Sequence, residues 1–229
     1  MIVLGIDTAL AACSAALVHD DRLLARRFEP MTRGHAERLF PMLGEVCAEA
    51  GLGLKNVDRI AVTTGPGSFT GTRAGLAAAR GIALAARCPG VGVTTLQAIA
   101  AAAEEVPASA IIGVLVDARR GGFYGQLFTA GGAGLTDPFA ATAEVAALRF
   151  AEAGPDDQPL LLIGTGAKPA LEAFRFWPGG VSLAQGNSLP DAAVVARLGA
   201  GLKPRESPPA PLYLRPPDAV PAAPGAVVR

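Results

Sequence analysis

A glycine-rich turn is the part of this sequence whose residue types and spacing come nearest to a site for chemistry. It reads TGPGSFTG from Thr64 to Gly71, and it connects an apolar segment at 60–63 to a helix expected over 70–87. Free N–H groups and the helix dipole at such a junction favour a bound anion. The position therefore suits a phosphate, provided that the residues needed to hold one are present.

The residues of this turn do not fit the known phosphate or nucleophile motifs. A P-loop needs a lysine that reaches the outer phosphates, and the sequence has none between Lys55 and Lys168. A dinucleotide fingerprint needs glycine where Thr70 stands and an acid about 20 residues later, but 59–103 contains no acid. A serine elbow needs glycine where Pro66 stands. We therefore expect no serine or P-loop catalysis here.

The histidines and cysteines give no metal-binding pattern. A helical metal site needs two ligands one turn apart, and His35 is followed at i+4 by Leu39. Cys13, Cys47 and Cys88 are odd in number and widely spaced, which excludes a zinc ribbon and a disulfide framework. We therefore expect no metal, no cofactor, and reduced thiols that are mostly buried.

The segments that position this turn occur twice along the chain. An apolar strand ending on a carboxylate opens each half, at 2–7 and 111–117, and an apolar strand runs into a glycine-rich turn at 60–63 and 160–163. The pattern predicts a duplicated β-β-β-α-β-α arrangement, which is an α/β actin-like (ASKHA, RNase H-like) fold with two lobes. The expected parts are an N-terminal lobe at 1–106 that carries partner-binding helices, a C-terminal lobe at 107–215, and a disordered Pro/Ala-rich tail at 216–229.

Asp7 and Asp117 end the first strand of each half. Actin-like ATPases place a D-x-G-[TS] turn there, because the glycine lets the backbone approach phosphate while the aspartate organises magnesium. Ala9 and Arg119 stand where that glycine is needed, so both phosphate turns are degraded. The two aspartates are a possible vestigial nucleotide site, but we favour a structural role in which each caps its local turn.

Two helices of the first half are candidates for binding another subunit. The helix over 35–50 is amphipathic with an acidic edge, and the helix over 70–87 has a stripe of small residues opposite an Arg/Leu face. The alternatives are that the small stripe packs on the chain's own sheet and that the charged faces are merely solvated. The expected interface residues are Leu39, Leu43, Val46, Gly71, Arg73, Ala74, Gly75, Ala78 and Ile82.

Local signals also predict where several helices begin. Pro41 lies inside the 35–50 helix and predicts a kink or a late start near that point. Thr94 with Gln97 predicts a capping box ahead of a helix over 96–106. Ser188 with Asp191 predicts another box ahead of a helix over 192–202.

Composition favours a globular chain without a strong field. The 229 residues are 51% hydrophobic and 17% charged, with 20 basic and 20 acidic side chains, so any contact with a polyanion must be local. The charge-free stretch 88–103, which no other stretch exceeds in length, contains Pro89 and polar residues and is no spanning helix. Asp7 interrupts the first apolar run, where a secretory signal would continue. We expect a cytoplasmic protein that does not enter the membrane.

Together the motifs resemble one family, the bacterial TsaB (YeaZ) proteins, which act in making the threonylcarbamoyladenosine of tRNA. The resemblance covers about residues 1–215 and is weakest from 131 to 159. The residues that carry it are Ile6–Thr8, Cys13–Leu17, His35, Leu39, Pro41–Leu43, Gly65–Arg73, Asp117–Arg119, Tyr124 and Tyr213–Arg215.

The resemblance implies a non-catalytic scaffold or activating subunit. Such a protein would pair through its two helices with a TsaD-type threonylcarbamoyltransferase, join a TsaE-type ATPase, and form a homodimer when alone. It would meet tRNA only indirectly through the complex; whether this subunit touches the RNA is left open. Two alternatives remain: an actin-fold ATPase or kinase that uses Asp7 and Asp117 on its own, and a peptidase, which the missing metal site and serine elbow disfavour.

Overall fold

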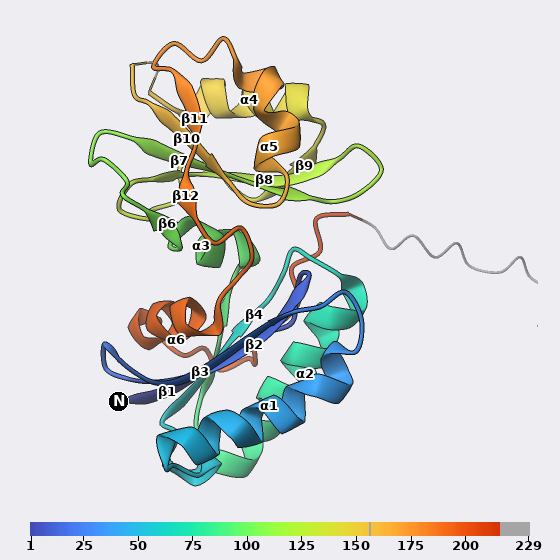
Figure 1. Cartoon of the computed structure of the whole chain (residues 1–229), viewed down its shortest axis with the longest axis vertical. Coiled ribbons are helices and arrows are strands. Elements are labelled where there is room, and N and C mark those ends of the chain that lie inside the picture. The colour runs from blue at the N-terminus through green and yellow to red at the C-terminus, as the bar shows by residue number, and fades with distance from the viewer. Residues whose placement is uncertain (156, 216–229) are drawn as a thin grey trace, which may run out of the picture.

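The computed structural model describes residues 1–155 and 157–215 and has two lobes, each built on a five-stranded sheet (Figure 1). The first sheet has the order β3-β2-β1-β4-β5, in which β1, β4 and β5 are parallel and β2 and β3 are antiparallel to their neighbours. Its strands are β1 (Ile2–Asp7), β2 (Ala12–His19), β3 (Arg22–Pro30), β4 (Arg59–Thr63) and β5 (Gly90–Val93).

The second sheet repeats this plan, with β9-β8-β7-β10-β11 matching the first order strand for strand. Parallel and antiparallel pairs also correspond, which confirms the predicted duplicated actin-like fold. The strands of this second sheet are β7 (Ile111–Asp117), β8 (Phe123–Thr129), β9 (Phe139–Ala141), β10 (Leu160–Ile163) and β11 (Val181–Leu183). The same half contains the helices α4 (Ala143–Ala153), α5 (Ala167–Ala170) and η2 (Leu171–Phe174), and the first half contains the short helix η1 (Leu54–Asn56).

Helices cover both faces of the first sheet. The helices α1 (His35–Ala50) and α2 (Phe69–Ala86) pack on one face, where Leu4 and Ile6 of β1 are fully buried. The helix α6 (Ala192–Gly201) packs on the other face, against Val3 of the same strand. Alternate residues of a strand point to opposite faces, so the continuous apolar run of β1 serves two cores. Figure 1 shows α6 among the elements of the first lobe, although it belongs to the end of the chain.

The chain crosses between the lobes more than once. Helix α3 (Thr95–Ala100) follows β5 but packs its Leu96 and Ile99 onto the second sheet. After the second half, a short ladder of β12 (Gln185–Gly186) with β6 (Ala103–Glu104) leads back to α6 in the first lobe. The lobe boundary at 106 and 107 therefore stays a proposal, and the predicted tail at 216–229 lies outside the described residues.

Three predictions about helix ends need correction. The capping box of Thr94 and Gln97 is present, but the helix stops at Ala100 because residues 103–104 pair with β12 instead. The cap of α6 is Asp191, not Ser188, because Pro190 forces the residue before it out of the helical region. Helix α1 begins at His35 and contains Pro41, so there is no late start, and the alternative of a kink at Pro41 stays a prediction.

The last helix is seated by a glycine. A Cβ on Gly5 of β1 would lie 1.9 Å from the backbone oxygen of Ala192, so only glycine allows α6 to come this close. The Ser14 hydroxyl accepts a hydrogen bond from the Ala192 N–H at 3.0 Å, and the Asp191 carboxylate accepts one from Ala193 N–H at 2.8 Å. The N-terminus of α6 is therefore fixed to the sheet by its own cap and by β2.

Candidate functional site

Helix α1 places all three of its predicted interface residues in the core of the first lobe. Leu39, Leu43 and Val46 are 1%, 3% and 0% exposed, and they pack against the sheet with Met42. Four apolar side chains on one helical face explain why the helix continues through Pro41, whose missing N–H costs a single hydrogen bond. The buried stripe thus holds α1 against the sheet, and the other faces of the helix lie outside the core.

Helix α2 is set against the end of β1 by two glycines. The Ser68 hydroxyl caps the helix by accepting from Gly71 N–H at 3.0 Å. A Cβ on Gly71 would lie 2.1 Å from the Thr8 backbone oxygen, and one on Gly75 would lie 2.4 Å from Thr8 Oγ1. The Thr8 hydroxyl also donates to the Gly71 oxygen at 2.7 Å. These two members of the small stripe therefore serve internal packing.

An apolar groove of about 720 Å³ runs between the outer faces of α1 and α2. Of the predicted interface residues, Leu39, Ala78 and Ile82 lie at its base, and Ala74 is half-buried on its α2 side. Arg73 is exposed but does not line it. The full lining is Ala36, Leu39, Phe40, Leu54, Lys55, Ala74, Ala77, Ala78, Gly81, Ile82, Ala85 and Ala86.

Several groove residues were missed from the sequence. Phe40 is 60% exposed and Leu54 is 36% exposed, and both contribute apolar surface next to Ala77 and Gly81 of α2. The sequence feature that could have indicated them is the pair Ala36 and Phe40, which are spaced i and i+4 beside the buried stripe. This pair makes the apolar face of the helix wider than the part that packs on the sheet. An exposed phenylalanine beside small residues is the feature that distinguishes this groove from ordinary helix packing.

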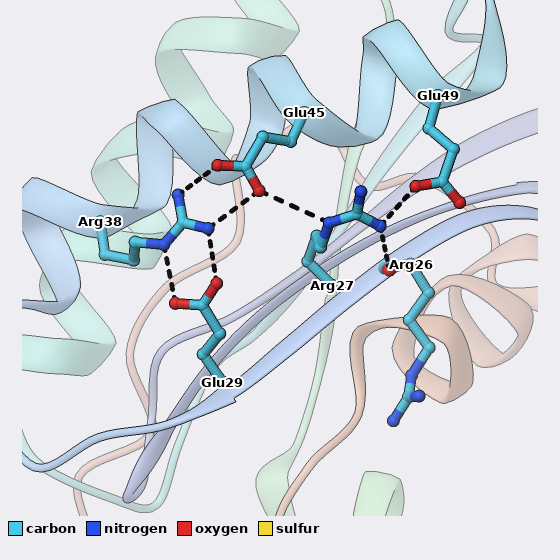
Figure 2. Close-up of polar contacts among 6 residues, drawn as sticks. All are labelled: Arg26, Arg27, Glu29, Arg38, Glu45 and Glu49. Carbon is cyan, nitrogen blue, oxygen red and sulfur yellow. Dashed lines mark hydrogen bonds and ion pairs between the residues drawn. The ribbon is translucent and has the colours of Figure 1, made fainter.

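A chain of ion pairs locks the opposite side of α1 to β3 (Figure 2). Arg38 donates through Nε to Glu29 at 2.7 Å and through Nη1 to Glu45 at 2.8 Å. Glu45 also lies 3.5 Å from Arg27, whose Nη1 contacts Glu49. Arg38 holds the pKa of the Glu29 and Glu45 carboxyls below their usual value. The acidic edge predicted for this helix is therefore paired within the chain.

Asp7 is completely buried and its carboxylate caps the turn that follows β1. Its Oδ1 accepts from Thr63 Oγ1 at 2.6 Å and from Ala9 N–H at 3.1 Å, while Oδ2 has no partner. Burial raises the pKa of the Asp7 carboxyl to about 7, against the opposing effect of these two hydrogen bonds. The Ser68 N–H donates to the Ala9 oxygen at 2.8 Å, so the turn is occupied by the chain's own groups.

Asp117 ends β7 at the corresponding place in the second half, and it is exposed. Its Oδ1 accepts from Arg119 N–H at 2.7 Å, two residues on, as Asp7 accepts from Ala9. Arg119 and Arg120 have φ of 62° and 52°, so the turn keeps the left-handed backbone that glycine favours although arginines occupy it. Both aspartates therefore hold turns, which supports the structural role expected from the sequence.

The described residues contain no group of three or more His, Cys, Asp or Glu side chains arranged to hold a metal ion. His35 Nε2 lies 2.9 Å from the Leu10 backbone oxygen and so fixes the β1–β2 connection. Within 1–155 and 157–215, no helix is both long and apolar enough to cross a bilayer. The arrangement offers two features for function: the α1–α2 groove and the paired turns between the lobes.

The repeated sheet order, with strand-end aspartates facing turns that lack a phosphate-binding glycine, defines an actin-like protein of the ASKHA class. ROK hexokinase from Thermus thermophilus shares the fold, with a TM-score of 0.52 at 16% identity over 87% of this chain and 98% of that one. YeaZ from Pseudomonas aeruginosa is much more similar, with a TM-score of 0.76 at 28% identity over 93% of this chain and 99% of that one.

Sequence comparisons agree with the structural ones. The family model for TsaD, tRNA N6-adenosine threonylcarbamoyltransferase, matches residues 28–169. The tRNA threonylcarbamoyladenosine biosynthesis protein TsaB of Escherichia coli is 40% identical over 124 residues, about half the length of each chain. An uncharacterized protein of Mycobacterium tuberculosis is 35% identical over 96% of this chain and 95% of its own. The chain belongs to the TsaB (YeaZ) family.

Proposed function

We propose that this protein is a non-catalytic subunit that activates a TsaD-type threonylcarbamoyltransferase, together with a TsaE-type ATPase, in forming threonylcarbamoyladenosine in tRNA. Membership of the TsaB family supports the pathway, since the E. coli relative is named for this biosynthesis. In this proposal the catalytic centre lies on the partner, the tRNA is met through the complex, and the assembly works in the cytoplasm.

The α1–α2 groove is the observation that carries this proposal. It presents Phe40, Leu54 and the alanines of α2 to solvent. The buried stripe and the ion pairs of Figure 2 fix α1 in position, and close packing of Gly71 and Gly75 on Thr8 fixes α2. A rigid apolar groove between two helices suits helices of another actin-like lobe, because helix ridges fit such grooves. Two helices from each partner bury roughly 1,200–2,000 Å², enough for a stable interface.

All the predicted interface residues except Arg73, which does not line the groove, have one of two roles within this proposal. Ala74, Ala78, Ile82 and Leu39 line the groove and would contact the partner directly. Leu43, Val46, Gly71 and Gly75 are buried and would act by holding the helices that form it. A second copy of the chain would use the same groove, so homodimer and heterodimer compete and the partner concentration decides which dominates.

The interlobe turns support a subunit without nucleotide chemistry of its own. Asp7 Oδ1 and the Ser68 N–H are bonded within the chain. Mixing the purified chain with a TsaD-type subunit is expected to give a complex in sizing chromatography and to stimulate tRNA modification. Absence of both effects would contradict the proposal. ATP turnover by the chain alone, abolished by Asp7→Ala, would establish the actin-fold ATPase instead.

A further inference from the structure

The residues after α6 form an extended segment, 203–215, that we call the C-terminal strap. It lies along the first lobe and is attached there at three points. Leu212 N–H donates to the Thr64 oxygen at 2.8 Å. Arg80 of α2 donates through Nε and Nη2 to the Pro209 oxygen at 3.1 and 2.6 Å. Arg73 Nε donates to Tyr213 Oη at 2.8 Å. The Arg/Leu face of α2 therefore binds the chain's own end.

The end of the strap is attached to the other lobe. Arg215 Nη1 donates to the Ala118 oxygen, in the turn after β7, at 3.2 Å. Its guanidinium carbon lies 5.6 Å from the centre of the Tyr124 ring, on β8. A Cβ on Gly122 would lie 1.7 Å from Arg215 Nη2, so this glycine leaves the space that the arginine fills. The strap thus bridges a helix of the first lobe and a hairpin of the second.

Glycines and an aromatic stack fit the first lobe to the strap. A Cβ on Gly92 would lie 3.3 Å from Pro209 Cβ, and one on Gly65 would lie 3.2 Å from the Leu212 oxygen. The Tyr213 ring stacks on Phe69 with centroids 5.6 Å apart, and the Arg73 guanidinium lies 3.6 Å from the Phe69 centroid. The strap makes more contacts with the first lobe than with the second, so its attachment to the first lobe is the firmer one.

We propose that the strap is a latch that fixes the angle between the two lobes. The chain itself crosses between the lobes twice, at 101–110 before the second sheet begins and at 184–191 after it ends. Two crossings permit hinge motion of the kind by which two-lobed proteins open and close. The strap adds a third, non-covalent attachment through Arg215, and it covers the Thr64–Gly65 turn at the end of β4.

The latch has a weak end and a strong end. The second-lobe end rests on one 3.2 Å hydrogen bond and one cation–π contact of Arg215, whereas the first-lobe end has the Thr64, Arg73 and Arg80 contacts. When the lobes move apart, the Arg215 contacts break first and the rest of the strap stays on α2. Loss of this single side chain should therefore widen the range of angles between the lobes without unfolding either one, although α3 still packs on the second sheet.

The test measures the distance between the lobes directly. Spin labels at Asp21→Cys, on the β2–β3 turn, and Glu152→Cys, on α4, report the interlobe distance by pulsed electron resonance after Cys47→Ser and Cys88→Ser; Cys13 is buried and is left unchanged. The intact strap is expected to give one narrow distance distribution. Arg215→Ala is expected to broaden it, with an added population at a different distance.

Two further variants keep the test decisive. Arg205 lies on the strap and is exposed, and none of the described residues forms a hydrogen bond or ion pair with its side chain. The Arg205→Ala substitution should therefore leave the distance distribution narrow. Gly122→Ala keeps Arg215 but displaces its guanidinium, because the added Cβ would lie 1.7 Å from Nη2, so it serves where Arg215→Ala does not fold. If Arg215→Ala folds, as judged by circular dichroism, and retains the narrow distribution of the Arg205→Ala protein, the latch does not exist. If Arg215→Ala fails to fold, a folded Gly122→Ala protein that retains the narrow distribution overturns the latch.

Discussion

At the scale of single residues, two glycines of the same helix have opposite roles. Gly75 faces Thr8 Oγ1, and a Cβ there would lie 2.4 Å away, whereas a Cβ on Gly81 would meet nothing within 4 Å. We expect Gly75→Ala to destabilise the chain by about 1–3 kcal/mol through overpacking. Gly81→Ala should instead stabilise it by about 1 kcal/mol, the helix preference of alanine over glycine.

Urea denaturation of the two variants and the parent chain checks this contrast. Equal midpoints for Gly75→Ala and the parent would mean that α2 does not pack tightly on Thr8. The structure also shows that a bulky residue at position 75 is a poor probe of partner binding, because it disturbs the core of the lobe first.

The buried carboxyl of Asp7 predicts a dependence of stability on pH. Its pKa of about 7 in the folded chain exceeds its ordinary value of 3.8, so the folded state holds a proton that the unfolded state releases. Stability should therefore fall as pH rises from about 4 to 7 and then level off, by a total of a few kcal/mol, since each pKa unit corresponds to about 1.4 kcal/mol.

Asp7→Asn mimics the protonated form and should remove this loss. Its free energy of unfolding, minus that of the parent, is expected to increase between pH 4 and pH 7 and to stay constant above. Asp117→Asn, at the exposed equivalent position, controls for the loss of a strand-end carboxylate. Parallel stability curves for Asp7→Asn and the parent would show that Asp7 is ionised in the folded chain over this range.

At the scale of elements, α1 is held between its apolar stripe and the ion pairs of Arg38. Replacing Arg38 by Met keeps the aliphatic chain, removes the ion-pair partner of Glu29, and leaves Glu45 only its 3.5 Å contact with Arg27. We expect a lower melting temperature at low salt and a smaller difference at high salt, because salt screens exposed charges.

The same pair of carboxyls sets the pH dependence of this effect. Since Arg38 lowers the pKa of Glu29 and Glu45 in the folded chain, its stabilisation is present above their ordinary pKa of 4.5 and is lost as pH falls through the lowered values. Arg22→Met, on the exposed end of β3, is the control. If the difference in melting temperature between Arg38→Met and the parent depends on neither salt nor pH, Arg38 stabilises the chain through packing instead.

Helix periodicity predicted α1 and α2 to within a residue at each end, because each carries one continuous apolar stripe. It failed for the end of α3, since the residues as far as 106 could extend a helix, but residues 103–104 pair with residues 185–186 instead. The same limit applied to the site. Periodicity shows that Leu43 and Gly75 face something apolar, but it does not distinguish the chain's own sheet from a partner.

At the scale of the whole molecule, the two halves keep the actin-like sheet order while their equivalent turns keep only the aspartate. In both, the strand-end carboxylate accepts an N–H two residues on, which is a local bond that needs no ligand. Ala9 and Arg119 in the sequence predict a loss of phosphate binding at both turns, and this stays a prediction. The strap was not predictable, because proline-rich sequence excludes regular structure without indicating what the segment contacts.

The central claim is that the α1–α2 groove is the surface that binds a TsaD-type subunit. Gly81→Arg and Gly44→Arg are matched, since both glycines are exposed in helices and a Cβ on either meets nothing within 4 Å, but only Gly81 lines the groove. Each change should favour the helix, so neither is expected to unfold the chain.

Sedimentation velocity of each variant mixed with the TsaD-type subunit is the most direct measurement. The account predicts that the Gly44→Arg protein forms the heterodimer as the parent does, while the Gly81→Arg protein sediments separately from the TsaD-type subunit. A heterodimer of undiminished affinity with Gly81→Arg would contradict it.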